Sequence, residues 1–593
     1  MFNEYYQLNY SDLQESLRQQ PKTGLSPLRL AVLRNVMVEP IEIYWKFLAK
    51  CSGFDTEIKF GQYDQIMAEA VGGAPELLNT KTDVVVVFCH LETFSQNLTR
   101  RFGALNKEQL KEECDRVDVF CHSVLSGIRR QTSAAILWHG FELPAYPAMG
   151  IMENATGGQQ VETVRQLNDK IKGILCDIEN AYYVDLDACR ARVGVKGFYD
   201  QRYWHIGHAP YSREAYREIA YEDFKYIRAL KSKNKKCLVL DCDNTLWGGI
   251  VGEDGLDKIS LSKTNPGSAY YEFQQEILNL YDRGVILAVC SKNNEADVWE
   301  VFRSHPDMVL RQEHIAAAQI NWDDKATNIR RIADELNIGT DSMVFVDDNE
   351  FELGLLRQSL PDVEVLSLAG RSPVEYRSML AECGLFDALN MTEEDRKRGR
   401  MYKEEAQRKK SVELAVDIPT YLRSLGMVAS VRLLDEFAVS RVSQLTQRTN
   451  QFNLTTRRYT EDDIRSFLKD EKAQAVTLEL KDRFGDMGMV GACILRFQPD
   501  HAEIDTLLLS CRAFGRRAEE ILLNRALQLA RDRGAKHVKA QYSATVKNVI
   551  VRDFYEQHGF LITSQEAGNK KYELKVSDLG STMPVEYLQI VTV

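Results

Sequence analysis

The chain has 593 residues, enough for roughly three or four domains. Apolar residues make up 44% and charged residues 27%, which is ordinary for globular protein. The formal net charge of −11 argues against a nucleic-acid-binding surface. The longest apolar run near the start, residues 84–89, is too short to cross a membrane. The twelve cysteines lack a CxxC pair or zinc spacing, and no signal peptide precedes them, so we expect reduced thiols in the cytoplasm.

The first 225 residues alternate between predicted strands and helices, as in an α/β domain. A helical start breaks at Pro21 and Gly24. Helices are expected at 40–51 and at about 93–130. Strands are expected at 28–36, 58–60, 83–89, 134–138 and 181–186.

This domain resembles a flavodoxin-like or SGNH-hydrolase fold, the second of which places a serine after its first strand and an Asp–x–x–His pair near its end. Here the first loop, residues 33–40, has no serine, and Asp200, His205 and His208 lack the three-residue spacing. Without a nucleophile a His–Asp pair has nothing to activate. We therefore expect recognition, docking or support from a degenerate SGNH-like domain. Three strand-end residues are candidate ligand contacts or ordinary loop residues: His90, Glu92 and His139.

The stretch KKCLVLDCDNTLWGG, residues 235–249, carries the strongest chemical signal. Its run 237–240 has the length of a buried parallel strand, and Asp241 and Asp243 follow it. Residues two apart at a strand's carboxyl end point the same way, into the crevice where open α/β sheets bind ligands. Two such charges need a cation or a shared proton between them, and Mg²⁺ is the simplest occupant. The alternative is a turn rich in Asp and Asn.

Glycines and a hydroxyl near this strand are candidates for binding phosphate. The flap WGGIVGEDG, residues 247–255, lets the backbone approach a phosphate ester, which makes Thr245, Gly248 and Gly249 candidates. The next predicted strand, VILAVCS, ends in Ser291, with Asn293 close behind. The Ser291 hydroxyl can bind a phosphoryl oxygen, cap the following helix, or do both.

Two later segments complete the set. Lys325 stands at the head of a predicted helix in an aspartate-rich loop, although a lone lysine is usually a solvated surface charge. The stretch SMVFVDDNEFE predicts a buried strand that ends in Asp347 and Asp348. We expect Asp348 to complete the Mg²⁺ shell and Asp347 to brace it.

The order DxDxT, Ser, Lys, Asp–Asp resembles the haloacid dehalogenase (HAD) phosphotransferase superfamily. The resemblance implies that Asp241 is the nucleophile and that Asp243 is the general acid/base and gives a backbone carbonyl to the metal. Ser291 and Lys325 would hold the phosphoryl group. The short gaps between these residues leave no room for a large cap, which favours a macromolecular acceptor or a lid from a neighbouring domain. The implied metal set is Asp241, Asp243, Asp347 and Asp348.

The predicted order of domains is 1–225, the HAD-type domain at 233–390, a charged linker at 391–425 and a last domain at 426–593. The linker stretch 393–411 is a mixed-charge helical segment with a basic excess. It is either a solvated connecting helix or a docking face for an acidic partner.

The last domain shows alternating runs at 475–480, 489–496 and 502–509, which predict antiparallel strands. A tight turn then leads into a long amphipathic helix, and backbone N–H groups there can cradle a pyrophosphate or phosphopantetheine. This layout resembles the GNAT acyltransferase fold. Arg512 and Gly515 match the turn of that family, whereas Arg517 replaces its last Gly or Ala, which counts against ordinary acetyl-CoA binding. Arg516 and Arg517 could still bind a phosphate group.

Taken together, the chain resembles the FkbH-like proteins, the HAD phosphatase subfamily IIIC. The resemblance implies a phosphatase and glyceryltransferase that takes D-1,3-bisphosphoglycerate and loads a glyceryl unit onto the phosphopantetheine of an acyl carrier protein, for polyketide-type biosynthesis. The matching stretches are VLDCDNTLWGGIVGEDG (239–255), VCSKNN (289–294), INWDDKATNI (320–329), VFVDDNEFE (344–352) and QLTQRTNQFNLTTRRYT (444–460).

Two cysteines are candidates for a thiol that carries the acyl group. Cys242 lies between the two aspartates in sequence, but strand alternation turns it toward the core. Cys511 lies in the turn of the last domain, and its alternative role is packing at a strand end. Three other functions stay open: a stand-alone Mg²⁺-dependent phosphatase of small phosphate esters, a binding or scaffold protein, and a GNAT-type CoA-dependent acyltransferase.

Overall fold

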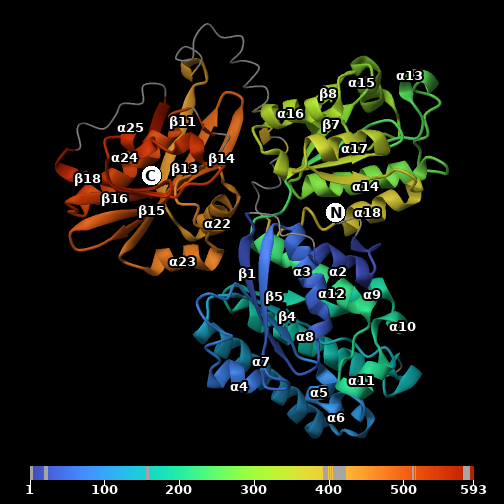
Figure 1. Ribbon diagram of the computed structural model, residues 1–593. Coiled ribbons are helices and arrows are strands. Elements are labelled where there is room, and N and C mark those ends of the chain that lie inside the picture. Colours follow the sequence, from blue (N-terminus) through green and yellow to red (C-terminus); the bar gives the residue numbers. More distant parts are fainter. Residues whose placement is uncertain are drawn as a thin grey trace. The chain divides into compact units, whose positions relative to one another are not determined.

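The computed structural model describes residues 5–18, 24–154, 159–391, 399, 401, 402, 404, 422–510, 513, 514, 516–578 and 588–592. The chain forms two compact units, Met1–Lys233 and Asn234–Val593 (Figure 1). In the described part of the chain, no helix combines the length and the apolar character that a membrane span requires.

The N-terminal unit is built on a parallel sheet with strand order β2-β1-β3-β4-β5. Every residue of β3 is buried, as expected for a parallel strand covered on both faces. The bounds of its strands are β1 (Ser26–Arg34), β2 (Phe54–Phe60), β3 (Val84–Phe88), β4 (Ala135–His139) and β5 (Ala181–Val184).

Two groups of helices cover this sheet. Helices α4, α7 and α8 share a core with the side chains of Val85, Val87, Ile136 and Trp138, whereas α2, α3, α9 and α12 pack together. The bounds are α2 (Tyr10–Arg18), α3 (Glu42–Cys51), α4 (Ile66–Gly72), α5 (Leu91–Phe94), α6 (Gln96–Thr99), α7 (Lys107–Gln131), α8 (Gln160–Cys176), α9 (Leu186–Val193), α10 (Val195–Phe198), α11 (Gln201–Gly207) and α12 (Arg213–Leu230).

The long helix expected from residue 93 begins only at Lys107. The side chain of Asn106 accepts a hydrogen bond from the Gln109 backbone and the Gln109 side chain accepts one from the Asn106 backbone. This reciprocal pair satisfies two free N–H groups at a helix start and marks it sharply. The preceding residues form α5, α6 and a single 3₁₀ turn instead.

A buried polar contact joins α12 and α3 to the sheet. His139 Nε2 lies 2.9 Å from Asp223 Oδ1, and Trp45 Nε1 donates to Asp223 Oδ2 at 3.0 Å. His139 Nδ1 donates to the Val87 carbonyl at 3.2 Å. Since a carbonyl can only accept, the imidazole carries a proton at Nδ1, and either Nε2 or the carboxyl group carries the second. Burial raises the pKa of Asp223, and the neighbouring His139 lowers it.

The second unit begins with another parallel sheet, of order β10-β9-β6-β7-β8. Consecutive strands are joined by helices, and the described residues between β6 and β7 form α13 and α14 without a separate cap domain. The bounds are β6 (Cys237–Leu240), α13 (Val251–Asp254), α14 (Ser268–Asp282), β7 (Ile286–Ser291), α15 (Glu295–Ser304), β8 (Ile315–Ile320), α16 (Lys325–Leu336), β9 (Met343–Asp347), α17 (Glu350–Ser359), β10 (Glu364–Ser367) and α18 (Tyr376–Glu382).

The C-terminal sheet is mixed, and its strands β13, β14 and β15 are antiparallel, as the sequence predicts. Strand β15 pairs with β16 in parallel only over His501–Glu503, so the two strands have no ladder beyond that point. The bounds are β11 (Met427–Leu433), α22 (Val439–Arg448), β12 (Phe452–Asn453), α23 (Glu461–Lys469), β13 (Ala473–Asp482), β14 (Gly485–Phe497), β15 (His501–Leu509), α24 (Ala518–Asp532), β16 (His537–Tyr542), α25 (Phe554–Gln557), β17 (Leu561–Glu566), β18 (Asn569–Lys575) and β19 (Leu588–Thr592).

The predicted fold class is therefore confirmed. The chain is an α/β multidomain protein with two parallel sheets and a C-terminal α+β part built on a mixed sheet. Most of the charged linker predicted at 391–425 lies outside the described residues, so its helical character stays a prediction.

We expect Asp223→Ala to lower the free energy of unfolding of the N-terminal unit by about 3–5 kcal/mol. The reason is that the Trp45 indole N–H and the His139 ring stay buried without their acceptor. Hydrogen exchange followed by mass spectrometry would measure this as faster exchange in β3 and β4. Asp223→Asn keeps an acceptor oxygen and should cost less. Equal protection in Asp223→Ala and the unchanged chain would contradict the prediction.

Candidate active site

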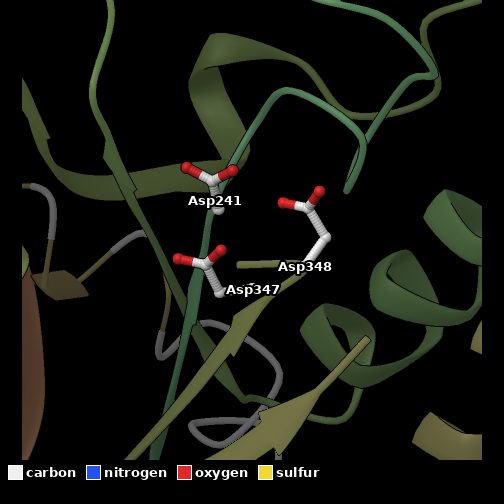
Figure 2. Close-up of side chains that lie close together, drawn as sticks. All are labelled: Asp241, Asp347 and Asp348. Carbon is white, nitrogen blue, oxygen red and sulfur yellow. The ribbon is translucent and has the colours of Figure 1, made fainter. Parts of the chain in front are cut away.

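Three aspartates meet at the carboxyl edge of the parallel sheet in the second unit. Strands β6 and β9 are neighbours, and the Asp241 backbone N–H donates to the Val346 carbonyl at 3.0 Å. This pairing places Asp241, just after β6, beside Asp347 and Asp348 at the end of β9 (Figure 2). One carboxylate oxygen from each lies within 4.8 Å of the others. Asp241 and Asp347 are buried, and Asp348 is half-buried.

Lys325 supplies the positive charge of this cluster. It is the first residue of α16, whose start is fixed by Asp324, the side chain of which accepts from the Thr327 backbone. Lys325 Nζ donates to Asp241 Oδ1 at 3.0 Å and also to Asp347 Oδ2. Burial would lower the pKa of Lys325, but the two carboxylates outweigh it and raise that pKa. The lysine is therefore a buried ion-pair partner, and the surface-charge alternative is excluded.

The cluster has a charge that suits a divalent cation. Burial raises the pKa of Asp241 to about 6, with Lys325 lowering it and Asp347 raising it. Burial likewise raises the pKa of Asp347 and of Asp348. With all groups ionised, three carboxylates and one ammonium leave a net charge of −2. Since like charges at this separation repel, and Mg²⁺ prefers carboxylate oxygens, the residues fit the predicted ion.

Asp243 faces a different environment from Asp241. Its Oδ1 accepts from Trp247 Nε1 at 2.8 Å and from the Val251 backbone at 3.1 Å, and its Oδ2 accepts from Asn293 Nδ2 at 2.8 Å. Asn244, which follows Asp243, turns the chain with a positive φ of 54°. The carboxylate of Asp243 is therefore not one of the three clustered groups. Its predicted metal contact through the backbone carbonyl stays a prediction.

Ser291 and Asn293 lie beside this aspartate. Ser291 ends β7 and is 1% exposed, and Asn293 Nδ2 lies 3.2 Å from its Oγ. Helix α15 has Asn294 at its N-cap, without a side-chain cap bond. Ser291 is therefore not the cap of that helix, and its hydroxyl accepts from Asn293, which also donates to Asp243. Asn293, predicted to bind phosphate, is bonded to Asp243 here and so acts on the position of that carboxylate.

The flap residues have structural roles in addition to the predicted one. The Gly248 N–H donates to the Ser260 carbonyl, and the Gly249 N–H donates to Asn244 Oδ1 at 2.9 Å. A Cβ on Gly248 would lie 2.9 Å from the Tyr270 ring, and Gly249 has a φ of +96°, which favours glycine. Thr245 is fully buried, and its hydroxyl has no hydrogen-bond partner among the described residues. Phosphate binding by these three residues stays a prediction.

Cys242 is fully buried, as strand alternation predicts. Burial, reinforced by Asp241, raises the pKa of its thiol well above the ordinary value. A thiolate is the nucleophilic form of cysteine, so this environment disfavours Cys242 as the acyl-carrying thiol.

The turn predicted to bind pantetheine or CoA is described only in part. Cys511, Arg512 and Gly515 lie outside the described residues. Arg516 is buried at 7% exposure. Arg517 adopts the left-handed conformation at the N-cap of α24, and its guanidinium forms two hydrogen bonds with Glu520, at 2.8 and 2.6 Å.

Trp247 is the site residue that sequence reasoning missed. It is fully buried, packs edge-on against Phe302 with ring centroids 6.3 Å apart, and points its indole N–H at Asp243. Its position four residues after Asp243, inside the turn that follows a strand, was the available signal. An indole nitrogen is a donor only, so a buried tryptophan beside an aspartate predicts this bond.

Comparisons with known proteins point to two kinds of enzyme. The chain is similar to the N-terminal part of the protein BF1531 from Bacteroides fragilis, which contains a phosphatase domain complexed with Mg. The identity is 27% and the TM-score 0.57, and the match covers 65% of this chain and 100% of that one. No curated protein matches the chain.

Residues 440–560 match the acetyltransferase (GNAT) family model. Similar solved structures include the ribosomal-protein-S18-alanine N-acetyltransferase from Escherichia coli, at 14% identity and a TM-score of 0.21 over 26% of this chain and 99% of that one. Another is the PaiA N-acetyltransferase from Thermoplasma acidophilum in complex with coenzyme A. Its identity is 15% and its TM-score 0.19, and the match covers 25% of this chain and 98% of that one. The chain is an enzyme that joins a part similar to a phosphatase-containing protein to a GNAT-type domain.

We expect Asp347→Asn to weaken Mg²⁺ binding at least about tenfold, because it removes one charge from the cluster and loosens the groups around it. Isothermal titration calorimetry of the full chain would measure this. The matched control is Asp323→Asn, which removes the same charge from an exposed residue that pairs with Arg331 at 2.6 Å. Equal loss in both variants would contradict a metal site at the cluster.

Proposed function

We propose that the chain is a Mg²⁺-dependent phosphatase and glyceryltransferase. It would take D-1,3-bisphosphoglycerate, remove phosphate, and load a glyceryl unit onto the phosphopantetheine thiol of an acyl carrier protein. The observation that carries the phosphatase half is the cluster of Asp241, Asp347 and Asp348 with the buried Lys325. The GNAT match supports the acyl-transfer half. The FkbH-like motifs supply the identity of the acyl group and of the carrier.

Asp241, Asp347 and Asp348 would hold the Mg²⁺. When bound, the ion supplies positive charge that neutralises the carboxylates and the phosphoryl oxygens. The similarity to a phosphatase domain complexed with Mg supports this assignment. Lys325 adds a fixed ammonium that donates to Asp241.

The residues divide the dephosphorylation between them. A carboxylate oxygen of Asp241 attacks phosphorus and forms an aspartyl phosphate while the bond to the leaving oxygen breaks. Asp243 gives its proton to that oxygen, then takes one from the water that hydrolyses the aspartyl phosphate. Ser291 Oγ and Lys325 Nζ bind the phosphoryl oxygens. The hydrogen bonds of Trp247 and Asn293 hold Asp243 in place for both proton transfers.

The acyl transfer needs less assistance, because a carboxylic–phosphoric anhydride is already activated. The carrier thiol attacks the acyl carbon, the C–S bond forms, the C–O bond to phosphate breaks, and phosphate leaves. The 3-phosphoglyceryl thioester then loses its remaining phosphate at the aspartate site. The site has no large cap among its described residues, which leaves room for a substrate attached to a protein.

A second candidate is a CoA-dependent acyltransferase, favoured by the family match over 440–560. The pairing of Arg517 with Glu520 occupies a guanidinium that could otherwise contact a pyrophosphate. Calorimetric titration with acetyl-CoA separates the two functions, because only the second requires CoA.

We expect Asp241→Asn to abolish removal of the second phosphate, the one that remains after acyl transfer, and so to stop the reaction at the phosphoglyceryl thioester. Intact-protein mass spectrometry of a holo acyl carrier protein, incubated with the enzyme, Mg²⁺ and D-1,3-bisphosphoglycerate, would show this as an adduct heavier than the glyceryl product by one phosphate. The unchanged enzyme should give the glyceryl adduct. No adduct, together with phosphate release from simple esters, would contradict the transferase and favour the stand-alone phosphatase.

We expect Trp247→Phe to lower kcat about tenfold with little change in KM, because it removes one of three donors to the general acid/base and leaves phosphate binding intact. Hydrolysis of p-nitrophenyl phosphate would measure both constants. Trp299→Phe is the matched control: Trp299 also packs against Phe302, at 5.3 Å, but bonds to Glu295 instead of Asp243. The same loss in both variants would indicate a packing effect and contradict the assignment.

A further inference from the structure

The N-terminal unit contains a pocket of about 490 Å³ that the proposed reaction does not use. It is lined by segments that follow β3 and β4, by the start of α8, and by residues 195–210. These segments lie at the carboxyl edge of the sheet, where open parallel α/β sheets bind ligands. The volume is in the range of about 300–1,000 Å³ that is usual for small-molecule sites.

His90 is held rigidly at the wall of this pocket. Its backbone N–H donates to Asn35 Oδ1 at 2.7 Å, and Asn35 Nδ2 donates to the His90 carbonyl at 3.1 Å. Asn35 is 3% exposed, so a buried amide directs both of its polar groups to the backbone of one pocket residue. The His90 ring also contacts the Trp204 indole, with centroids 5.3 Å apart. Asn35 thus fixes the backbone of His90, and Trp204 packs beside its ring.

The Nδ1 atom of His90 is buried and has no hydrogen-bond partner among the described residues. Leaving a buried polar atom unpaired costs about 1–3 kcal/mol, and such atoms in folded proteins call for an explanation. A bound ligand that hydrogen-bonds to Nδ1 supplies one. Since a neutral imidazole can donate or accept at this atom, a hydroxyl group satisfies it in either tautomer.

The charges of the pocket balance. Glu92 forms an ion pair with Arg100. Glu142 Oε1 accepts from the Tyr211 hydroxyl at 2.6 Å, and Lys196 is the second cation that lines the pocket. An anionic ligand would meet two carboxylates, and a cationic one would meet a guanidinium and an ammonium. A neutral ligand that both donates and accepts hydrogen bonds is repelled by neither the carboxylates nor the cationic groups.

Partly exposed aromatic rings line the same pocket. Trp204 is half-buried, Tyr199 is half-buried, and Tyr146 is 80% exposed. Such rings offer a flat apolar face together with a polar tip. A ligand that packs on them needs an apolar face of its own, in addition to its hydroxyl groups.

We propose that this pocket binds a neutral polyhydroxylated ligand of the sugar class. The C–H face of its ring packs on Trp204, and its hydroxyl groups bond to His90, Glu142 and Lys196. Sugars combine an apolar ring face with hydroxyls that both donate and accept, which is the combination that the walls of the pocket require. The residues of this pocket are separate in sequence and in fold from the aspartate cluster. The proposal for the pocket therefore does not depend on the proposed function.

Saturation-transfer difference NMR on the full chain tests this, with methyl β-D-glucopyranoside, methyl β-D-galactopyranoside and methyl α-D-mannopyranoside as probes and benzoate as an aromatic anion. We expect at least one glycoside to receive saturation at its ring C–H protons and benzoate to receive none. Trp204→Ala and Glu142→Gln should each weaken that binding about tenfold. Trp204→Phe, which keeps an aromatic face, should bind more tightly than Trp204→Ala.

The matched control is Tyr203→Ala. Tyr203 is the neighbour of Trp204 on α11, is 49% exposed, and does not line the pocket, so its variant should bind as the unchanged chain does. Thermal unfolding of every variant excludes loss of the fold, and Trp204→Phe provides the comparison if Trp204→Ala does not fold. The proposal is overturned if no glycoside binds, if only benzoate binds, or if binding is unaffected by the changes at Trp204 and Glu142.

Discussion

Three clustered carboxylates, two of them bonded to one buried lysine, are the constraint on which the second unit depends. Asp241, Asp347 and Asp348 are forced together because β6 and β9 are adjacent parallel strands that end at the same edge. Their repulsion is relieved only in part by Lys325, which bonds to two of them. The remaining charge of −2 is unfavourable for the empty fold and favourable for a divalent cation. The order of strands in the sheet therefore has two consequences. It makes the carboxylates repel one another, and it gives the cluster its affinity for a divalent cation.

The two aspartates of the DxD motif have contrasting surroundings at one strand end. Asp241 lies among like charges, whereas Asp243 lies among three N–H donors from Trp247, Val251 and Asn293. Two carboxylates with contrasting surroundings are the arrangement that separates a nucleophile from a proton carrier. Two of the three donors come from the flap after β6, and the third comes from the loop after β7. The position of Asp243 therefore depends on the packing of the flap as well as on its own strand.

Much of this site could be predicted from the sequence, because its members follow strand ends. The runs before Asp241, Ser291 and Asp347 are short, apolar and buried, and alternation correctly turns Cys242 into the core. Contacts between segments far apart in sequence could not be predicted in this way. The bond from Asn293 to Asp243, fifty positions away, is an example. The predicted contact of Asn293 with phosphate stays a prediction. The start of α7 was misplaced because the apolar spacing continues through residues 93–106, while the capping pair at Asn106 decides where the helix begins.

The N-terminal unit shows why a residue type at a strand end does not by itself identify a site. His90 follows β3, and His139 ends the adjacent parallel strand β4. Both are candidates for ligand contact from the sequence. His139 is 1% exposed, and both of its ring nitrogens face oxygen atoms of the protein, in Val87 and Asp223. No hydrogen-bonding capacity is left for a ligand, so its role is to join α12 to the sheet. The backbone of His90 is fixed by Asn35 while its Nδ1 has no partner in the described structure. The difference lies in the partners that the fold supplies: a histidine whose nitrogens are already bonded stabilises the core, and one held in place with a nitrogen to spare is available to a ligand.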